Sequence, residues 1–189
     1  MAISSPNRII WQYFQCLRRI INRANIDTDD EEKKQDVALC IFMAITIVEA
    51  FINIYFRIIV EEQGFAQYKA LIVKDLKSHK TIDYKIRNWP RRIFGKTLNF
   101  SEGIPKQFLE LKRLRNELMH FKSSHEAMHM PGVSVYGLAD TSALDDLDIS
   151  KAFLAHDIAE GMLIQLFRLR GIAENEMSSH IHLWTGRII

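Results

Sequence analysis

The longest apolar stretch of the chain, Val37 to Val60, limits the folds that the sequence can adopt. Its 24 residues include only two charged ones, Glu49 and Arg57. Together with Asn53 they recur every four residues, which places three polar side chains in one stripe along a helix. An apolar helix of about 20 residues can cross a membrane, but a charged side chain inside the bilayer is costly. The sequence therefore favours a long helix at the centre of a bundle, with no membrane contact.

The length and composition fit one all-helical domain. A chain of 189 residues is long enough for a single well-buried core. Its eight glycines and four prolines are few for a β fold, which needs frequent tight turns. We expect an all-α bundle of about five main helices over residues 1–172, followed by a C-terminal tail at 173–189.

Apolar spacing and helix-boundary residues predict where the helices begin and end. The Trp89-Pro90 step biases the residue before the proline away from helix, so we expect only a short helix there, from Pro90 to Leu98. Ala127 to Leu144 lacks periodicity, which predicts a long loop. The main expected helices run from Pro6 to Arg23, from the acidic run at 27–32 to Glu62, from Tyr68 to His79, from a Ser101 cap to Phe121, and from Asp148 or Ser150 to Arg170.

The cysteines and most of the histidines give no sign of a metal site. Cys16 and Cys40 lie in apolar helical contexts without paired or metal-like spacing, so we expect two reduced thiols. Residues 1–8 lack the pattern of an export signal. Two histidine pairs have no third ligand at a suitable spacing, namely His125 with His129 and His180 with His182. We expect a cytoplasmic protein that needs no metal or other cofactor.

The segment Leu114 to Phe121 places a guanidinium and an imidazole on one predicted helix. The five steps from Arg115 to His120 turn a helix by about 140°, so these two side chains face different ways. Asn116 and His120 lie one turn apart. Arg115 and His120 can meet over one substrate if a second copy of the helix faces the first across a two-fold axis. The motif therefore predicts a homodimer.

The pattern Arg-Asn-x-x-x-His at Arg115, Asn116 and His120 resembles the motif of the HEPN superfamily, the higher eukaryotic and prokaryotic nucleotide-binding domains. The resemblance covers about Ile104 to Phe121 and, more loosely, the preceding long helix at 49–53. It implies a homodimeric helical bundle and a ribonuclease whose paired Arg-x4–6-His motifs line a cleft between the protomers. It also implies a toxin-antitoxin or phage-defence setting, with a nucleotidyltransferase-like antitoxin as partner.

Metal-independent RNA cleavage needs a base for the 2′-hydroxyl, a cation for the charged phosphorane and an acid for the 5′-oxygen. Imidazole and guanidinium suit these roles. We predict that His120 is the general acid or base, that Arg115 holds the scissile phosphate, and that Asn116 orients the imidazole or donates to the phosphate. Arg115 then needs an acidic neighbour such as Glu49, or an interface open to phosphate. The alternative is a surface ion pair for Arg115 and a helix-end role for His120.

Positive charge is concentrated around this motif. Lys85 to Lys122 contains ten Lys or Arg and three Glu, a local balance of +7, although the whole chain has a net charge of only +2. Nucleic acid binding takes much of its affinity from phosphate neutralisation. In the alternative interpretation these charges form a solvated face and Trp89 packs in the core. In the main interpretation these residues bind RNA, and the indole of Trp89 stacks on an unpaired base. The predicted RNA contacts are Arg87, Trp89, Arg91, Arg92 and Lys112.

A second function also agrees with the sequence. A non-catalytic HEPN-like module would bind a nucleotide, RNA or a partner protein and act by association. Such a module tolerates the loss of His120 if charge and shape are kept, whereas a nuclease does not. A membrane protein is a third possibility, and only the apolar stretch at 37–60 favours it.

Overall fold

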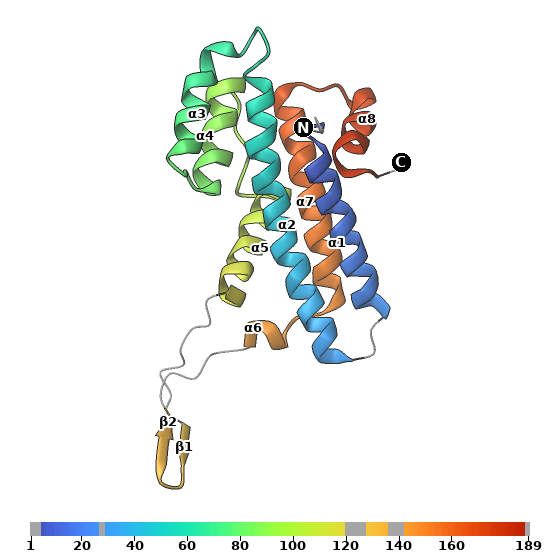
Figure 1. The fold of residues 1–189 in the computed structure, drawn as a ribbon, viewed down its shortest axis with the longest axis vertical. Coiled ribbons are helices and arrows are strands. Elements are labelled where there is room, and N and C mark those ends of the chain that lie inside the picture. The colour runs from blue at the N-terminus through green and yellow to red at the C-terminus, as the bar shows by residue number, and fades with distance from the viewer. Residues whose placement is uncertain (1–4, 27–28, 120–127, 136–141, 188–189) are drawn as a thin grey trace.

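The chain forms a helical bundle. The structure is a computed structural model, and it describes residues 5–26, 29–119, 128–135 and 142–187. Four long helices make up the body: α1 (Arg8–Ile26), α2 (Asp30–Ile59), α5 (Gly103–Met119) and α7 (Ile149–Arg170). Helices α2 and α7 lie side by side and run in one direction, while α1 and α5 run in the other (Figure 1). The all-α prediction is confirmed.

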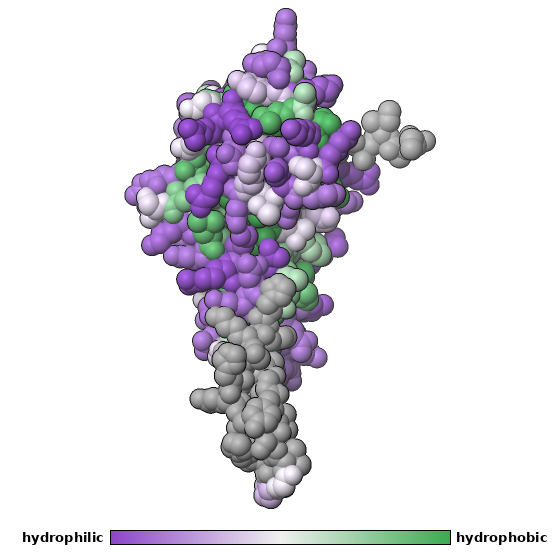
Figure 2. All heavy atoms as spheres, turned by 90° about the vertical axis from the view of Figure 1, so that its left-hand side faces the viewer, coloured by the Kyte–Doolittle hydropathy of each residue, from purple (hydrophilic) through white to green (hydrophobic). Residues whose placement is uncertain are grey.

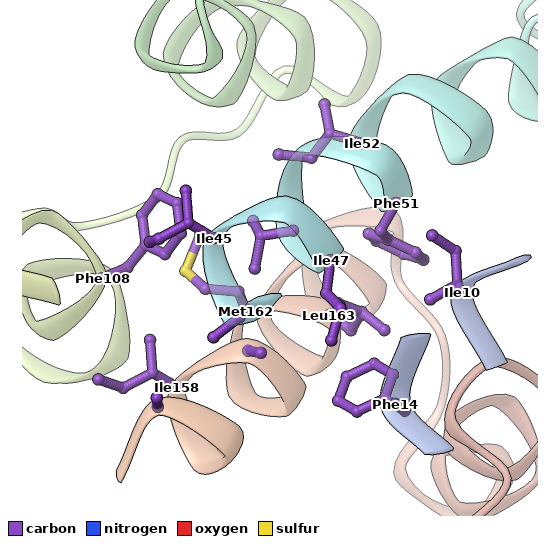
Figure 3. Close-up of a cluster of buried hydrophobic side chains, with 14 of the residues drawn as sticks. Ile10, Phe14, Ile45, Ile47, Phe51, Ile52, Phe108, Ile158, Met162 and Leu163 are labelled. Carbon is purple, nitrogen blue, oxygen red and sulfur yellow. The ribbon is translucent and has the colours of Figure 1, made fainter. Parts of the chain in front are cut away.

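The side chains between these helices form one apolar core. Figure 3 shows Phe14 of α1, Ile47 of α2 and Leu163 of α7 pointing toward one another, and Phe108 of α5 beside Met162. All five are fully buried. Helix α5, which carries the predicted motif, is therefore held on its inner side by contacts with α2 and α7.

Helix α2 is central, as its composition predicts. Asp29 caps its start by accepting a hydrogen bond from the backbone of Glu32 at 2.9 Å, and the acidic residues of the first turn favour the positive end of the helix. Among the described helices, α2 is the one long and apolar enough to cross a membrane by length and composition, and 56% of its apolar window is buried inside the structure. Its apolar faces pack against α1, α5 and α7.

The prediction for residues 82–98 is wrong. Helix α4 (Ile82–Phe94) starts at a Thr81 cap and continues through Pro90, so the proline lies inside the helix instead of opening it. Proline removes one backbone hydrogen bond, but Ile86, Trp89 and Ile93 lie on one buried face with helical spacing. The burial of that face outweighs the lost bond. Before it stand a short 3-10 helix, η1 (Ala66–Tyr68), and α3 (Lys69–Lys77).

Helix α5 begins slightly later than predicted. Ser101 lies outside the helix, where its backbone donates to Asn99 Oδ1 at 3.1 Å, and the helix starts at Gly103. Phe108, Leu111 and Leu118 form the buried face, as the apolar spacing predicts. Phe121, expected on the same face, lies outside the described residues.

The segment predicted as a long loop contains two short strands and most of a short helix. Strands β1 (Met128–Met130) and β2 (Val133–Val135) form an antiparallel hairpin, and Gly132 in its turn has a φ of 83°. Helix α6 (Ser142–Asp145) follows. The strands are three residues each, which is too short for an alternating apolar pattern to be recognised.

Helix α7 begins at an Asp148 cap, as predicted, and the Asp148 carboxylate accepts from the backbone of Ser150 at 2.7 Å. Two apolar positions in its first turns, Phe153 and Leu154, are 48% and 46% exposed and do not belong to the core. Leu154 lines a groove described below.

The expected C-terminal tail is a helix, α8 (Glu174–Thr185), so the prediction for 173–189 is wrong. Met177, Ile181 and Trp184 are buried, and the Trp184 ring meets Phe51 edge-on with 4.9 Å between centroids. These three positions follow helical spacing over barely two turns, which is a weak sequence signal. Helix α8 packs beside α1 and α7 (Figure 1).

Two polar side chains, Asn7 just before α1 and Arg18 within it, bind the end of α8. Asn7 Nδ2 donates to the carbonyl of Leu183 at 2.6 Å, and Arg18 Nη1 donates to that of Thr185 at 2.7 Å. Helix-end carbonyls have no partner within their own helix, so these bonds satisfy them. Beyond the helix, Arg187 Nη1 donates to Glu160 Oε2, a nearly buried carboxylate, at 2.8 Å.

Candidate functional site

Arg115 lies on the inner face of α5 and is only partly exposed. It stands one turn from Leu111 and one turn from Leu118, both buried. Its Nη1 lies 3.5 Å from the sulfur of Met119, and its Nε is buried without a hydrogen-bond partner. An unpartnered buried donor costs about 1–3 kcal/mol, and more when it is charged. The Nε–H of Arg115 therefore lacks a hydrogen-bond acceptor among the described residues.

Glu49 does not meet that need. Its Oε1 lies 3.8 Å from Nζ of Lys85, whose side chain is 6% exposed, and the same ammonium lies 5.8 Å from the centre of the Trp89 ring. Within the described part of the chain, Arg115 has no carboxylate at ion-pair distance. The expectation that Glu49 supports Arg115 is therefore wrong: Glu49 neutralises a buried lysine of α4.

The other two motif residues differ in what the structure says of them. Asn116 is exposed on α5, so its amide is accessible to a ligand. His120 lies outside the described residues. Its role as general acid or base, and its relation to Arg115, stay predictions.

The predicted RNA-contact residues differ in their surroundings, and Trp89 is described separately below. Arg87, Arg91 and Arg92 are exposed on α4, and over the described ranges none of them has a carboxylate at ion-pair distance. Lys112 reaches across from α5 to Asp83 of α4, with 2.5 Å between Nζ and Oδ2. It is therefore already neutralised.

Trp89 is fully buried, so the prediction that it stacks on an unpaired base is wrong. Its indole Nε1 donates to Oδ2 of Asp75, another buried residue, at 2.9 Å. The sequence places the tryptophan between two arginines, Arg87 and Arg91, which resembles an exposed site. On a helix, however, residues two apart face nearly opposite sides, so exposed arginines are compatible with a buried tryptophan.

Sequence reasoning missed the lysines of α3. The hydrogen bond between Asp75 and Trp89 joins α3 to α4, which brings Lys74 and Lys77 to the same part of the molecule as Arg87 and Arg91. Figure 2 looks onto this side of the bundle, where hydrophilic side chains predominate with apolar patches between them. The charge pattern of 69–80 was available in the sequence, but its place beside α4 depends on a tertiary contact.

A groove of about 480 Å³ lies on another face of α5, between α5, α6 and α7. Its apolar lining residues include Leu111, Leu114, Leu154 and Ile158. Three carboxylates and two cations line it as well: Glu110, Glu117, Asp146, Arg113 and Lys151. Arg115 is not among its lining residues. The acidic groups disfavour phosphate, so this groove suits a different ligand from the one that Arg115 suits.

Neither a metal-binding cluster in the described ranges nor a similar protein adds to the description of this site. Among the residues whose placement the structure gives, no group of three or more His, Cys, Asp or Glu side chains is arranged to hold a metal ion. Comparison of the chain with protein-family models, with curated proteins and with solved structures gave no match. The resemblance to the HEPN superfamily therefore stays a prediction.

Proposed function

We propose that this chain is a metal-independent endoribonuclease of the HEPN type, in which Arg115 binds the scissile phosphate and His120 is the general acid or base. The observation that carries this proposal is that the partly exposed Arg115 has no described carboxylate at ion-pair distance, and that its Nε has no hydrogen-bond partner among the described residues. A phosphate oxygen is an acceptor of the charge and geometry that this group lacks.

The remaining parts of the mechanism follow from the chemistry of the motif. Asn116, exposed beside Arg115, would orient the imidazole of His120 or donate to the phosphate. Two protomers would contribute two histidines, so the base and the acid would come from different chains of a homodimer. The unpaired arginines of α4 would attract the RNA by phosphate neutralisation.

The resemblance also suggests the biological setting. In this proposal the chain is a cytoplasmic toxin or phage-defence effector without membrane contact, and a nucleotidyltransferase-like antitoxin restrains it. The long apolar helix α2 then serves as the core helix of a bundle, a role that its contacts with α1, α5 and α7 support.

A non-catalytic binding module is the second candidate, and the groove between α5, α6 and α7 favours it. Its apolar lining residues and mixed charges suit an apolar side chain of a partner protein flanked by polar groups. In that case α5 would present a protein-binding surface, and His120 would be dispensable.

RNA cleavage by matched variants separates the two candidates. Purified wild type, His120→Ala, Arg115→Met and Arg113→Met would be incubated with total RNA, with and without EDTA. Arg113 is the control, since it lies on the same helix with the same charge but is exposed and paired with Glu117 at 3.8 Å. We expect chelator-resistant cleavage that falls at least about 100-fold in the first two variants and persists in Arg113→Met.

Two results would contradict the ribonuclease. One is cleavage that disappears with EDTA, and the other is undiminished cleavage by His120→Ala. Urea unfolding of Arg115→Met shows whether a loss of cleavage reflects a loss of folding. Since the replaced group has no acidic partner in the described structure, its midpoint should not fall below that of the wild type.

A further inference from the structure

We propose that the α3–α4 hairpin binds single-stranded RNA, with Arg87 stacked on Phe100 as a platform for an unpaired base and lysines and arginines around it as phosphate contacts. The inference takes its ligand from the proposed function. It moves the base contact from Trp89 to Arg87, which the sequence predicts only as an RNA contact, and to Phe100, which the sequence does not single out.

Helices α3 and α4, which we call the α3–α4 hairpin, form one fixed unit. The buried hydrogen bond from Trp89 to Asp75 ties its two helices together, and Thr81 caps the start of α4. The hydroxyl of Ser78 donates to the carbonyl of Asp75 at 3.1 Å in the connection between the helices. A fixed unit loses little conformational entropy when it binds a ligand.

Among the residues that the structure places, most positive charges of the hairpin are unpaired and its negative charges are not, since only Lys69 and Lys85 have a carboxylate partner, Glu61 and Glu49 respectively. Asp75 accepts from Trp89 in the interior, and Asp83 is paired with Lys112. These are the two acidic residues between positions 69 and 96. On the described chain, the following side chains have no carboxylate at ion-pair distance: Lys74, Lys77, Lys80, Arg87, Arg91, Arg92 and Lys96. This excess of unneutralised cations fits a polyanion.

Two of these cations lie over aromatic rings. The guanidinium carbon of Arg87 is 4.3 Å from the centre of the Phe100 ring, and Nζ of Lys80 is 5.1 Å from the centre of the Tyr84 ring. Arg87 is exposed, so a ligand can reach its planar group while Phe100 supports it from one side. A nucleobase stacks on an arginine plane as it does on an aromatic ring.

The platform selects for single strands. Stacking on Arg87 needs the face of a base, and in an RNA duplex that face is covered by the neighbouring base pairs. Phosphates on either side of the stacked base would meet Arg91, one turn further along α4 and on the same side of the helix as Arg87. Lys74 and Lys77 border a shallow hollow on α3 that also contains Val73 and Ala70, so α3 carries a separate basic surface.

Binding by conservative variants tests the platform. Fluorescence anisotropy would measure the affinity of His120→Ala protein, which the proposed mechanism leaves unable to cut, for a labelled 20-nucleotide oligouridylate and for a 20-base-pair RNA duplex. Three further changes are made in this background: Arg87→Lys, which keeps the charge but not the plane, Phe100→Leu, and Arg19→Gln as a control. Arg19 is exposed on α1, a helix on the opposite side of α2 from α3 and α4 (Figure 1).

We expect tighter binding to the single strand than to the duplex. Arg87→Lys and Phe100→Leu should each weaken single-strand binding at least about fivefold without changing its salt dependence, since neither removes a charge. Arg19→Gln should bind as the parent does. Equal affinity for strand and duplex, or unchanged binding by both platform variants, would overturn the inference.

The outcome separates this inference from the ribonuclease proposal. Binding that depends on Arg87 and Phe100, together with wild-type protein that cuts no RNA, would reject the ribonuclease and keep the platform. Cleavage that depends on His120, with binding indifferent to Arg87→Lys and Phe100→Leu, would do the reverse. Absence of both binding and cleavage would reject both. Thermal unfolding of Arg87→Lys, a surface change, shows whether lost binding reflects lost folding.

Discussion

The indole nitrogen of Trp89 and the carboxylate of Asp75 form a buried hydrogen bond of 2.9 Å between α3 and α4. The pair turns the tryptophan away from solvent and the acidic group away from the basic surface. It therefore explains two properties of the hairpin at once, namely why Trp89 cannot stack on RNA and why Asp75 does not neutralise the neighbouring lysines.

Trp89→Phe should destabilise the fold, because it leaves the Asp75 carboxylate buried without its partner. We expect a loss of at least about 2 kcal/mol in the free energy of unfolding, measured by urea titration. The double variant Trp89→Phe with Asp75→Asn should recover part of this loss, since an amide is cheaper to bury unpaired than a carboxylate. A double variant no more stable than Trp89→Phe would show that the pair is not what the tryptophan contributes.

Gly186→Ala should destabilise the chain more than Gly95→Ala. Both glycines have left-handed backbones, with φ of 68° and 69°, so both variants bear a strain of about 1 kcal/mol. A Cβ at position 186 would also lie 2.0 Å from Nε1 of Trp11, whereas nothing lies within 4 Å at position 95. We expect an additional loss of about 1–3 kcal/mol at position 186, measured by thermal or urea unfolding.

Trp11 provides the control for that comparison. Adding Trp11→Ala to Gly186→Ala removes the two closest contacts and leaves Gln15 Nε2 at 2.9 Å from the added Cβ, so the double change should cost less than the sum of the two single changes. Strict additivity would mean that the indole moves aside freely and that only the backbone angle matters.

Stability should decline at alkaline pH. Burial raises the pKa of Tyr55 to about 12, and burial, together with Asp36 and Cys16, raises the pKa of Cys40 to about 12. Both groups ionise more easily in the unfolded chain, so their stabilising effect is present below the unfolded pKa and is lost as pH rises through the folded pKa. The window runs from about pH 9 for the thiol, or about pH 10 for the phenol, to about pH 12.

Urea midpoints measured from pH 8 to pH 11 would test this. Tyr55→Phe cannot ionise, so its midpoint should fall less steeply above about pH 10 than that of the wild type, whatever its stability at pH 8. Parallel curves for the two proteins would contradict the assignment to Tyr55.

The long elements of the fold were predictable because their signals are local. The acidic first turn and the apolar length of α2, the Asp148 cap of α7 and the spacing of Phe108, Leu111 and Leu118 in α5 are all readable in one window of sequence. The wrong predictions concern helices α4 and α8, which are stabilised by contacts with residues distant in the sequence. Pro90 is tolerated inside α4 because Trp89 and Ile93 are buried, and α8 forms where its apolar residues meet Phe51 and Tyr55.

The candidate site follows the same division. The sequence identifies Arg115 and Asn116 as unusual residues on a helix, and the structure adds that Arg115 is partly buried and has no acidic partner among the residues whose placement is described. The sequence could not indicate that Glu49 pairs with Lys85, because that pairing depends on which side of α2 faces α4. Likewise Phe100 follows Arg87 by 13 residues and meets it only after α4 has ended.

The bonds from Asn7 and Arg18 to the carbonyls of Leu183 and Thr185 couple the two ends of the described chain. During synthesis α1 emerges from the ribosome long before α8, so the side chains of Asn7 and Arg18 stay hydrated for most of translation. Completion of the bundle is then a late step that joins residues more than 160 positions apart. Nascent chains released before residue 185 would expose the aromatic cluster that Trp184 covers, and would be open to capture by chaperones.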